Sequence, residues 1–157
     1  MKHFNPENFQ SCLLGILLGR SNSLKDRLLD QHLESDGVTS AQFKVLVIMA
    51  QWDVDTPAEL CRHLSLDSGS MTRMLDRLEQ KKLLQRRRCE SDRRQIRLAL
   101  TADGKRLADR LPHIGADALN QLVGVLEPGE VAELERILLK ILVAAGDPLT
   151  LARIGVK

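Results

Sequence analysis

Residues 56–80 read TPAELCRHLSLDSGSMTRMLDRLEQ and decide the fold. Thr56 followed by Pro57 is typical of a capped helix start, and Asp67 or Ser68 is then expected to cap a second helix that runs to about Gln80. The short turn LSLD separates the two helices. Apolar residues at helical spacing predict the buried face of the second helix: Met71, Met74, Leu75 and Leu78. A short helix, a tight turn and a second helix in this order predict a helix-turn-helix.

The residues after the second helix are rich in arginine. Residues 85–98 read QRRRCESDRRQIRL, with six arginines and no lysine. Ile96, Leu98 and Leu100 alternate with the residues between them, which predicts a strand over 95–100 paired with a strand over 83–88. The segment CESD and the arginines after it would form the tip of this hairpin. A hairpin that directly follows a helix-turn-helix predicts a wing.

Helical patterns flank this block on both sides. They predict one helix over about 7–34, a second that Ser40 caps, a third that Thr101 caps and that bends near Pro112, and a fourth from EPGE to about residue 145. The segment DVDTP is expected to be a turn or a very short strand. The expected fold is therefore mainly α. A winged helix-turn-helix lobe with a two-stranded wing occupies 35–100, between helical regions over 1–34 and 101–157.

The small net charge of +2 hides an uneven distribution. Between Arg62 and Arg110 there are 14 basic and 7 acidic side chains, whereas the rest of the chain has 9 basic and 14 acidic ones. A basic centre between acidic ends attracts phosphates to the centre. We therefore expect double-stranded DNA to be the partner of the predicted lobe.

The second helix of the helix-turn-helix is expected to enter a major groove by its N-terminal turn, whose residues are small and polar. Arg73 would read a guanine or hold a phosphate. The wing would contact phosphates and the adjacent minor groove, where arginine is preferred, and Asp92 would orient a neighbouring arginine. The candidate DNA-binding residues are Asp67, Ser68, Gly69, Ser70, Thr72, Arg73, Arg77, Arg88, Arg93 and Arg94.

Two other interpretations of the basic block stay open. An arginine-rich hairpin can be a solvated sheet edge that resists aggregation, and a winged helix can bind protein instead of DNA. A DNA-binding wing should lose affinity steeply as salt rises, whereas a protein-binding wing should depend on salt weakly.

The segments TSAQFKVL (39–46), DSGSMTRMLDRLEQKKLLQRR (67–87) and SDRRQIRLALTADG (91–104) resemble the MarR (multiple antibiotic resistance regulator) family of winged-helix transcription factors. The similarity is close from Thr39 to Gly104, and the flanking helices match in length and order only. The resemblance implies an obligate homodimer in which the helices of 1–34 and 101–157 interlock with those of a second copy. It also implies binding to an inverted repeat, usually with repression of transcription.

The resemblance further implies release from DNA by a small phenolic or aromatic carboxylate, bound between the dimer helices and the DNA-binding lobe. By position, Ile16, Arg20, Phe43, Val47, Trp52 and Arg86 would line this pocket. Arg20 and Arg86 would pair with the anion and Phe43 would stack on its ring. The residues alone leave another interpretation open. Phe43 and Val47 belong to an apolar helix face in any case, and Arg86 can bond to DNA, Asp76 or Glu79.

Cys12 offers a different kind of effector. The segment CLLGILLGR (12–20) resembles the organic-hydroperoxide-sensing branch of the family, as does LDSGS (66–70), which implies a thiol sensor at Cys12. That branch supplies tyrosines, whereas this chain has none, and Phe43 stands where one is expected. In the other interpretation Cys12 is a buried small hydrophobe. Cys89, on the wing, is a second candidate for oxidation and would cross-link two copies.

The sequence predicts no enzyme, no metal and no cofactor. It contains no GxSxG, P-loop or HExxH motif, and Cys61-x-His63 lacks a second pair of ligands at zinc-site spacing. Three cysteines without a CxxC pair favour a reducing compartment. The longest apolar run, residues 12–19, is too short to span a bilayer. A cytoplasmic protein is therefore expected.

Overall fold

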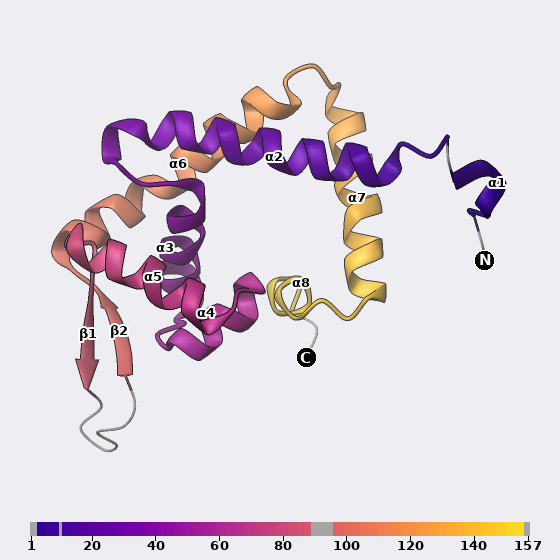
Figure 1. Ribbon diagram of the computed structural model, residues 1–157. Helices are drawn as coiled ribbons and strands as arrows, with labels where there is room; N and C mark the ends of the chain where they lie inside the picture. Colours follow the sequence, from indigo (N-terminus) through magenta and orange to yellow (C-terminus); the bar gives the residue numbers. More distant parts are fainter. Residues whose placement is uncertain (1–2, 10, 89–95, 156–157) are drawn as a thin grey trace.

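The computed structural model describes residues 3–9, 11–88 and 96–155 of the 157-residue chain. The fold is mainly helical with a two-stranded sheet, as predicted. In chain order the elements are α1 (Pro6–Phe9), α2 (Leu14–Leu33), the 3-10 helix η1 (Glu34–Asp36), α3 (Ser40–Trp52), α4 (Pro57–Leu64), α5 (Ser68–Gln80), β1 (Leu84–Arg88), β2 (Ile96–Leu100), α6 (Ala102–Val123), α7 (Pro128–Ala144) and α8 (Pro148–Arg153). In Figure 1, α2 lies along α6, the lobe of α3, α4, α5 and the hairpin hangs below one end of this pair, and α7 leaves from the other end.

The predicted helix-turn-helix is formed by α4 and α5. Thr56 caps α4 by accepting a hydrogen bond from the Glu59 amide, and Asp67 caps α5 by accepting one from the Ser70 amide. Ser65, between the two helices, has a left-handed backbone with φ 51° and lets the chain turn sharply. Leucines dominate the core on which both helices pack. Its largest fully buried side chains are Leu33, Val45, Leu46, Leu60, Met71, Leu75, Leu78, Leu84 and Leu111.

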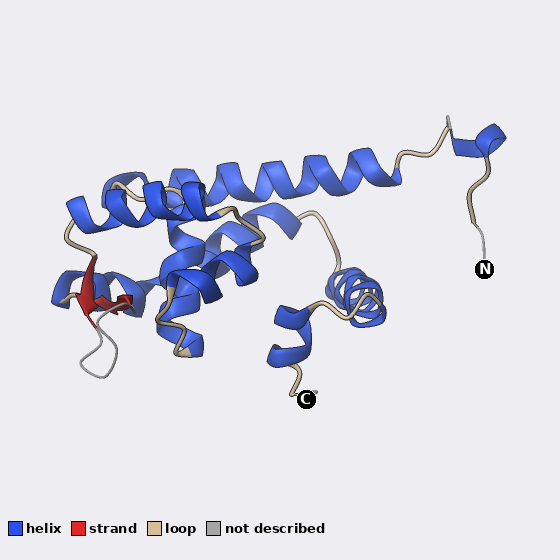
Figure 2. Ribbon diagram, turned by 60° about the horizontal axis from the view of Figure 1, so that its bottom comes forward, coloured by secondary structure: helices blue, strands red, loops and turns tan. Residues whose placement is uncertain are grey.

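The wing is a short antiparallel hairpin that projects from the helices (Figure 2). Leu84 pairs with Leu100 and Arg88 with Ile96. The predicted alternation in β2 is confirmed at its centre, since Leu98 is buried in the core whereas Arg97 is exposed. The Leu98 amide donates to the Asp55 carbonyl oxygen at 2.7 Å, so the segment DVDTP bonds to β2 without forming a strand.

The prediction of a single helix from residue 7 to residue 34 is wrong at its N-terminal end. The short helix α1 ends at Phe9, and α2 begins only at Leu14. Short polar side chains bond to the backbone around this break: the Asn8 side chain accepts from the Asn5 amide, and the Ser11 hydroxyl donates to the Asn8 carbonyl. Such local bonds compete with helical ones and allow the chain to change direction.

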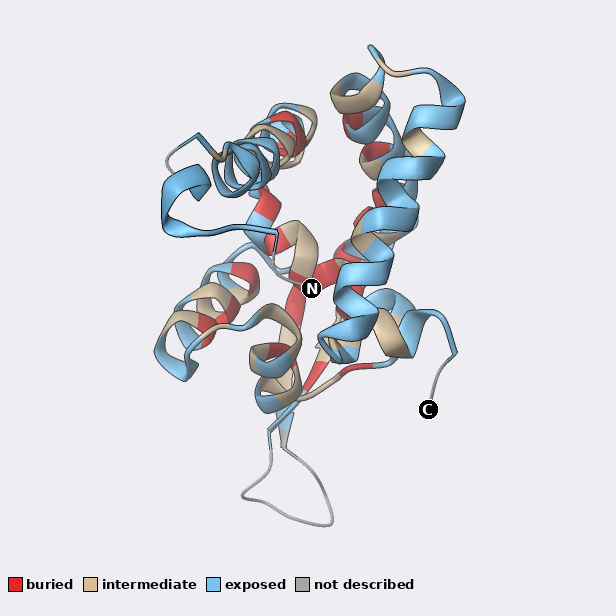
Figure 3. Ribbon diagram, turned by 90° about the vertical axis from the view of Figure 1, so that its right-hand side faces the viewer, coloured by how far each residue is buried: buried red, intermediate tan, exposed pale blue. Residues whose placement is uncertain are grey.

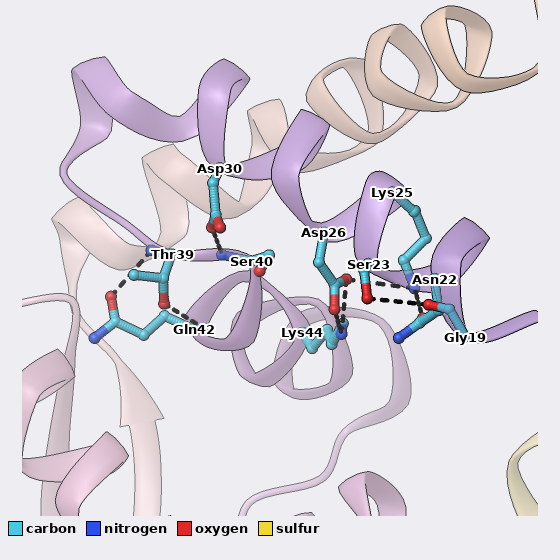
Figure 4. A network of polar contacts seen from close by, with 10 residues as sticks. All are labelled: Gly19, Asn22, Ser23, Lys25, Asp26, Asp30, Thr39, Ser40, Gln42 and Lys44. Atoms are coloured by element: carbon cyan, nitrogen blue, oxygen red, sulfur yellow. Dashed lines mark hydrogen bonds and ion pairs between the residues drawn. The ribbon is translucent and has the colours of Figure 1, made fainter. Parts of the chain in front are cut away.

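The link between α2 and α3 also differs in detail from the prediction. Thr39, not Ser40, caps α3, and it forms a capping box with Gln42. The Ser40 amide instead donates to Asp30 Oδ1 in α2 at 2.5 Å. Lys44 Nζ lies 2.9 Å from Asp26 Oδ1 in α2 (Figure 4). These bonds fix the lobe to the end of α2 and leave the start of α2 free of the lobe.

The C-terminal helices follow the predicted order and add one element. Thr101 caps α6, which continues through Pro112, and Glu127 caps α7. The further helix α8 was not predicted. No described residue of α7 or α8 is buried, and Figure 3 shows α7 as almost entirely exposed. Among the described residues, no helix combines the length and the apolar character needed to cross a membrane.

Candidate nucleic-acid interface

The first turn of α5 presents a row of small and basic side chains to solvent. Asp67, Ser68, Gly69, Thr72 and Arg73 are exposed, while Met71 of the same turn is buried and anchors the helix. The Thr72 hydroxyl donates to the Ser68 carbonyl oxygen at 2.8 Å, which turns this side chain along the helix. The predicted DNA-binding residues of this turn therefore share one exposed end of the helix. This end is narrow, because no large apolar side chain projects from it.

Hydrogen bonds connect three side chains of this turn. The Ser70 hydroxyl donates to Asp67 Oδ2 at 2.6 Å, and Arg73 Nη2 donates to Ser70 Oγ at 3.1 Å. The Asp67 carboxylate also accepts from the Ser70 amide at 2.8 Å. These Ser70 hydrogen bonds, the hydroxyl first, lower the pKa of the Asp67 carboxyl below its ordinary value, and the charge of Arg73 adds to the effect. The Asp67 side chain of the folded protein is therefore negatively charged at neutral pH.

Arg73 and Arg77 line a shallow hollow of about 220 Å³ between α5 and the start of α3. Its other lining residues are Thr39, Ala41, Gln42, Ser70 and Met74. Two guanidinium groups beside a hollow make it a place where an anion is attracted.

The base of the wing is tied to α5 by Arg86. Its guanidinium lies 2.7 Å from Asp76 Oδ1 and 2.6 Å from Glu79 Oε2, and its backbone amide donates to Glu79 Oε1 at 3.1 Å. Both carboxylates belong to α5, so β1 and α5 are held in one orientation by a forked contact that lysine could not make. Either acid had been a candidate partner from the sequence, and the structure uses both.

Part of the predicted wing interface lies outside the described residues. This holds for Cys89, Asp92, Arg93 and Arg94. Arg88 is the last residue of β1. Two contacts were not predicted from the sequence, one on strand β2 and one at the C-terminal end of α5. Arg97 pairs with Asp55, and Lys81 donates to Gln42 Oε1 at 2.8 Å. These partners lie 42 and 39 residues apart, so no local signal predicts them.

Two of the six predicted effector residues, Ile16 and Arg86, lie far apart within a single copy. Ile16 and Arg20 are exposed near the start of α2. At 1.5 Å per residue, Ile16 lies about 25 Å from the end of α2, where the lobe with Arg86 begins. Figure 1 shows the start of α2 and β1 at opposite ends of the molecule. Ile16 and Arg86 therefore do not share a site within one copy.

Three members of this predicted pocket, Phe43, Val47 and Trp52, are partly buried inside the lobe. Phe43 and Val47 pack against the core on α3, and a Cβ atom added at Gly115 of α6 would lie 3.5 Å from Phe43 Cζ. Trp52, at the end of α3, meets His63 edge to face at a centroid distance of 5.6 Å. Phe43, Val47 and Trp52 therefore contribute to packing, whatever else they contact.

Cys12 lies in the break between α1 and α2 and is half-buried, as is Cys61 in α4. Across the described part of the chain, no group of three or more His, Cys, Asp and Glu side chains is placed to hold a metal ion. A second hollow, of about 420 Å³, lies between the end of α3, β2 and α6, with Asp53, Asp55, Lys105 and Asp109 at its wall.

Comparisons with known proteins agree on one family. A sequence model of the MarR family matches residues 38–96. The multiple antibiotic resistance protein MarR of Escherichia coli is 39% identical over 130 residues, which is 82% of this chain and 90% of the relative. The organic hydroperoxide resistance transcriptional regulator of Bacillus subtilis is 32% identical over 108 residues, covering 69% and 71%. The crystal structure of a cysteine-to-serine mutant of E. coli MarR complexed with operator DNA superposes with a TM-score of 0.75 at 35% identity, covering 88% of this chain and 99% of the other.

Proposed function

The chain belongs to the MarR family of transcriptional regulators, which are not enzymes, and from this premise we propose that it is a repressor that binds an inverted-repeat operator as a homodimer. We further propose that a small aromatic anion releases it. The observation that carries the proposal is the exposed first turn of α5 beside a wing whose base is tied to that helix by Arg86. The E. coli relative whose crystal structure contains operator DNA shares the overall fold, with a TM-score of 0.75.

In the proposed complex, the first turn of α5 enters the major groove of each half-site. Arg73 contacts a guanine edge, since arginine can bond to both acceptors that guanine presents there. Arg77 and the wing arginines Arg88, Arg93 and Arg94 hold phosphates and the adjacent minor groove. The contact between Arg86 and the α5 carboxylates supports this arrangement, because it fixes the angle between the two elements that must reach neighbouring grooves.

Self-association is supported by the apolar side chains that one copy leaves exposed near both ends. Soluble monomeric proteins rarely expose many large apolar side chains close together. On the N-terminal side these side chains are Phe4, Phe9, Leu13, Leu14, Ile16, Leu17 and Leu18, and on α7 they are Leu134, Ile137, Leu139, Ile141, Leu142 and Val143. In the proposed dimer, the start of α2 and α7 of one copy cover those of the other. Two half-sites one helical turn apart then bind two copies of α5.

Replacing Ile141 by alanine tests this surface. Ile141 is 54% exposed in one copy, and its truncation is expected to weaken self-association by about 1–2 kcal/mol per copy through lost apolar burial. Sedimentation equilibrium at micromolar concentration measures this change. The matched control is Lys140→Ala on the same helix, which should leave association unchanged. A wild-type protein that sediments as a monomer would contradict the homodimer.

The decisive experiment for DNA binding is a fluorescence-anisotropy titration of the purified protein against the duplex upstream of its own gene, with a shuffled duplex of equal length as control. Affinity should fall as salt rises from about 50 to 200 mM, with a log–log slope of roughly −0.9 for each phosphate contacted. Preference for the natural duplex together with this slope is the expected result. A folded dimer that binds both duplexes equally weakly would favour the protein-binding alternative.

The proposed effector competes with Asp76 and Glu79 for Arg86, the arginine that ties the wing to α5. A carboxylate that pairs with Arg86 would take it from Asp76 and Glu79 and free the wing from α5, and Arg20 from the second copy would complete the anion site. Phe43, Val47, Trp52 and Ile16 would meet the aromatic ring. A ligand shifts the equilibrium only by binding the DNA-incompetent arrangement more tightly.

The same titration with additives tests the effector. Saturating salicylate should lower operator affinity, whereas uncharged salicylamide should not, because the arginines recognise the carboxylate. Loss of binding with an organic peroxide, restored by a thiol reductant, would instead assign control to Cys12 or Cys89. Operator binding that ignores salicylate would remove it as an effector.

A further inference from the structure

We propose that Ser70 and Asp67 are positioning residues for Arg73: they fix its guanidinium on the exposed first turn of α5 before DNA arrives. The inference rests on the proposed function, in which Arg73 contacts the operator. It assigns the serine and the aspartate an indirect role in sequence discrimination instead of a contact with DNA.

The direction of the hydrogen bonds carries the argument. A serine hydroxyl has one proton to donate and lone pairs that accept. The Ser70 proton goes to Asp67 Oδ2 at 2.6 Å, and Arg73 Nη2 donates to the Ser70 oxygen at 3.1 Å. The hydroxyl therefore has no proton left for a phosphate or a base acceptor. In this arrangement Ser70 serves the arginine.

Asp67 determines which atoms donate and which accept in these hydrogen bonds. Its carboxylate has no proton of its own and holds the backbone and the side chain of Ser70 at once, through Oδ1 at 2.8 Å and Oδ2 at 2.6 Å. The hydroxyl of Ser70 must therefore turn its lone pairs toward Arg73. The hydrogen bonds from Ser70 and the nearby charge of Arg73 stabilise the Asp67 carboxylate, which explains how an acid is tolerated at the tip of a helix that approaches phosphates.

Gly69 leaves the space in which this unit fits. A Cβ atom at Gly69 would lie 3.2 Å from Asp67 Oδ1 and 3.5 Å from Arg73 Nη1. The carboxylate and the guanidinium thus both pass close to the glycine, from opposite sides along the chain. Both groups therefore border the space that a side chain at position 69 would occupy.

Holding the guanidinium in advance lowers the conformational entropy that Arg73 loses when it binds. An arginine held in one orientation also distinguishes better between a correct and an incorrect base, because its fork cannot swing to another acceptor. The expected consequence is better discrimination among operators without any additional contact to DNA.

A double-mutant cycle with Ser70→Ala and Arg73→Ala tests the proposal by fluorescence anisotropy on the operator and on operators with single base-pair substitutions. Ser70→Ala should weaken operator binding by about 2- to 10-fold, the cost of ordering one long side chain, and should reduce discrimination at one base pair per half-site. Its salt slope should match that of the wild type, because the variant removes no positive charge. In the Arg73→Ala background, Ser70→Ala should have no further effect.

Conservative variants separate positioning from folding. Ser70→Thr keeps the hydroxyl and should retain discrimination, whereas Asp67→Asn keeps a helix cap but loses the charge and should behave like Ser70→Ala. Additive effects of Ser70→Ala and Arg73→Ala would overturn the proposal in favour of a direct DNA contact by Ser70. If Arg73→Ala alone binds like the wild type, the proposed role of Arg73 fails and the positioning role fails with it.

Discussion

Arg73→Ala is expected to weaken operator binding by about 1–3 kcal/mol per half-site, or roughly 5- to 150-fold for each. The reason is that Arg73 is exposed in the second turn of α5 and its guanidinium reaches Ser70 in the first turn, the part of the lobe proposed to enter the major groove. The loss should concentrate on one base pair per half-site, and binding to shuffled DNA should change little. Anisotropy titrations with the operator and with its single-substitution series measure both effects.

The control for Arg73 is Arg106→Ala, which removes the same charge. Arg106 is exposed on α6 and pairs with Asp103 three residues earlier, outside α5 and the wing. Its loss should change operator affinity by less than about threefold, as for a distant screened charge. Equal losses for both variants would mean that Arg73 contributes general charge and reads no base.

Gly104→Ala is expected to destabilise the fold by about 3 kcal/mol or more, because the added Cβ atom would overlap with the backbone of a neighbouring segment. Gly104 is buried in the first turn of α6, and a Cβ atom there would lie 1.8 Å from the Leu83 carbonyl oxygen. The same oxygen accepts from the Thr101 amide at 3.1 Å, so it cannot move without breaking the start of α6. No side-chain rotation relieves this overlap, and α6 must separate from the wing.

Urea unfolding at one fixed protein concentration measures this prediction, because stability depends on concentration when copies associate. Gly129→Ala in the first turn of α7 is the control, since nothing lies within 4 Å of its added Cβ atom. It should stay within about 1 kcal/mol of the wild type. A Gly104→Ala protein that unfolds at the same urea concentration as this control would contradict the predicted overlap.

The elements that could be predicted from the sequence are those set by short-range interactions. Thr56, Asp67 and Thr101 cap their helices through bonds to amides three residues on, so the signal and its effect lie together in the chain. The winged lobe followed from these caps and from the alternation around Leu98. Short-range bonds also explain the wrong prediction at α1. Apolar periodicity predicted a continuous helix there, whereas local hydrogen bonds of Asn8 and Ser11 accompany a break in it.

Features that depend on distant partners could not be predicted in the same way. Ser40 resembles a cap in the sequence, yet its amide bonds to Asp30 in the preceding helix, and Thr39 takes the capping position. Arg86 had four candidate partners, namely an anionic ligand, DNA, Asp76 and Glu79, and only the packing of β1 on α5 brings Asp76 and Glu79 to it together. The apolar pattern of α2 does not indicate whether Ile16 and Arg20 contact residues of their own copy or of a second copy.

The exposed apolar residues of α7 lie after the buried core in the sequence, and this order affects how the chain folds during its synthesis on the ribosome. The buried core runs from Leu28 to Ala118 and includes no residue of α7 or α8. The lobe can therefore close while the last helices are still being added at the ribosome, as units do when chains are made from the N-terminus. The proposed association surface becomes complete only when α7 has emerged. The N-terminal part of this surface is synthesised first, but its α7 counterpart follows the lobe, so two copies can associate fully only after the lobe of each is complete.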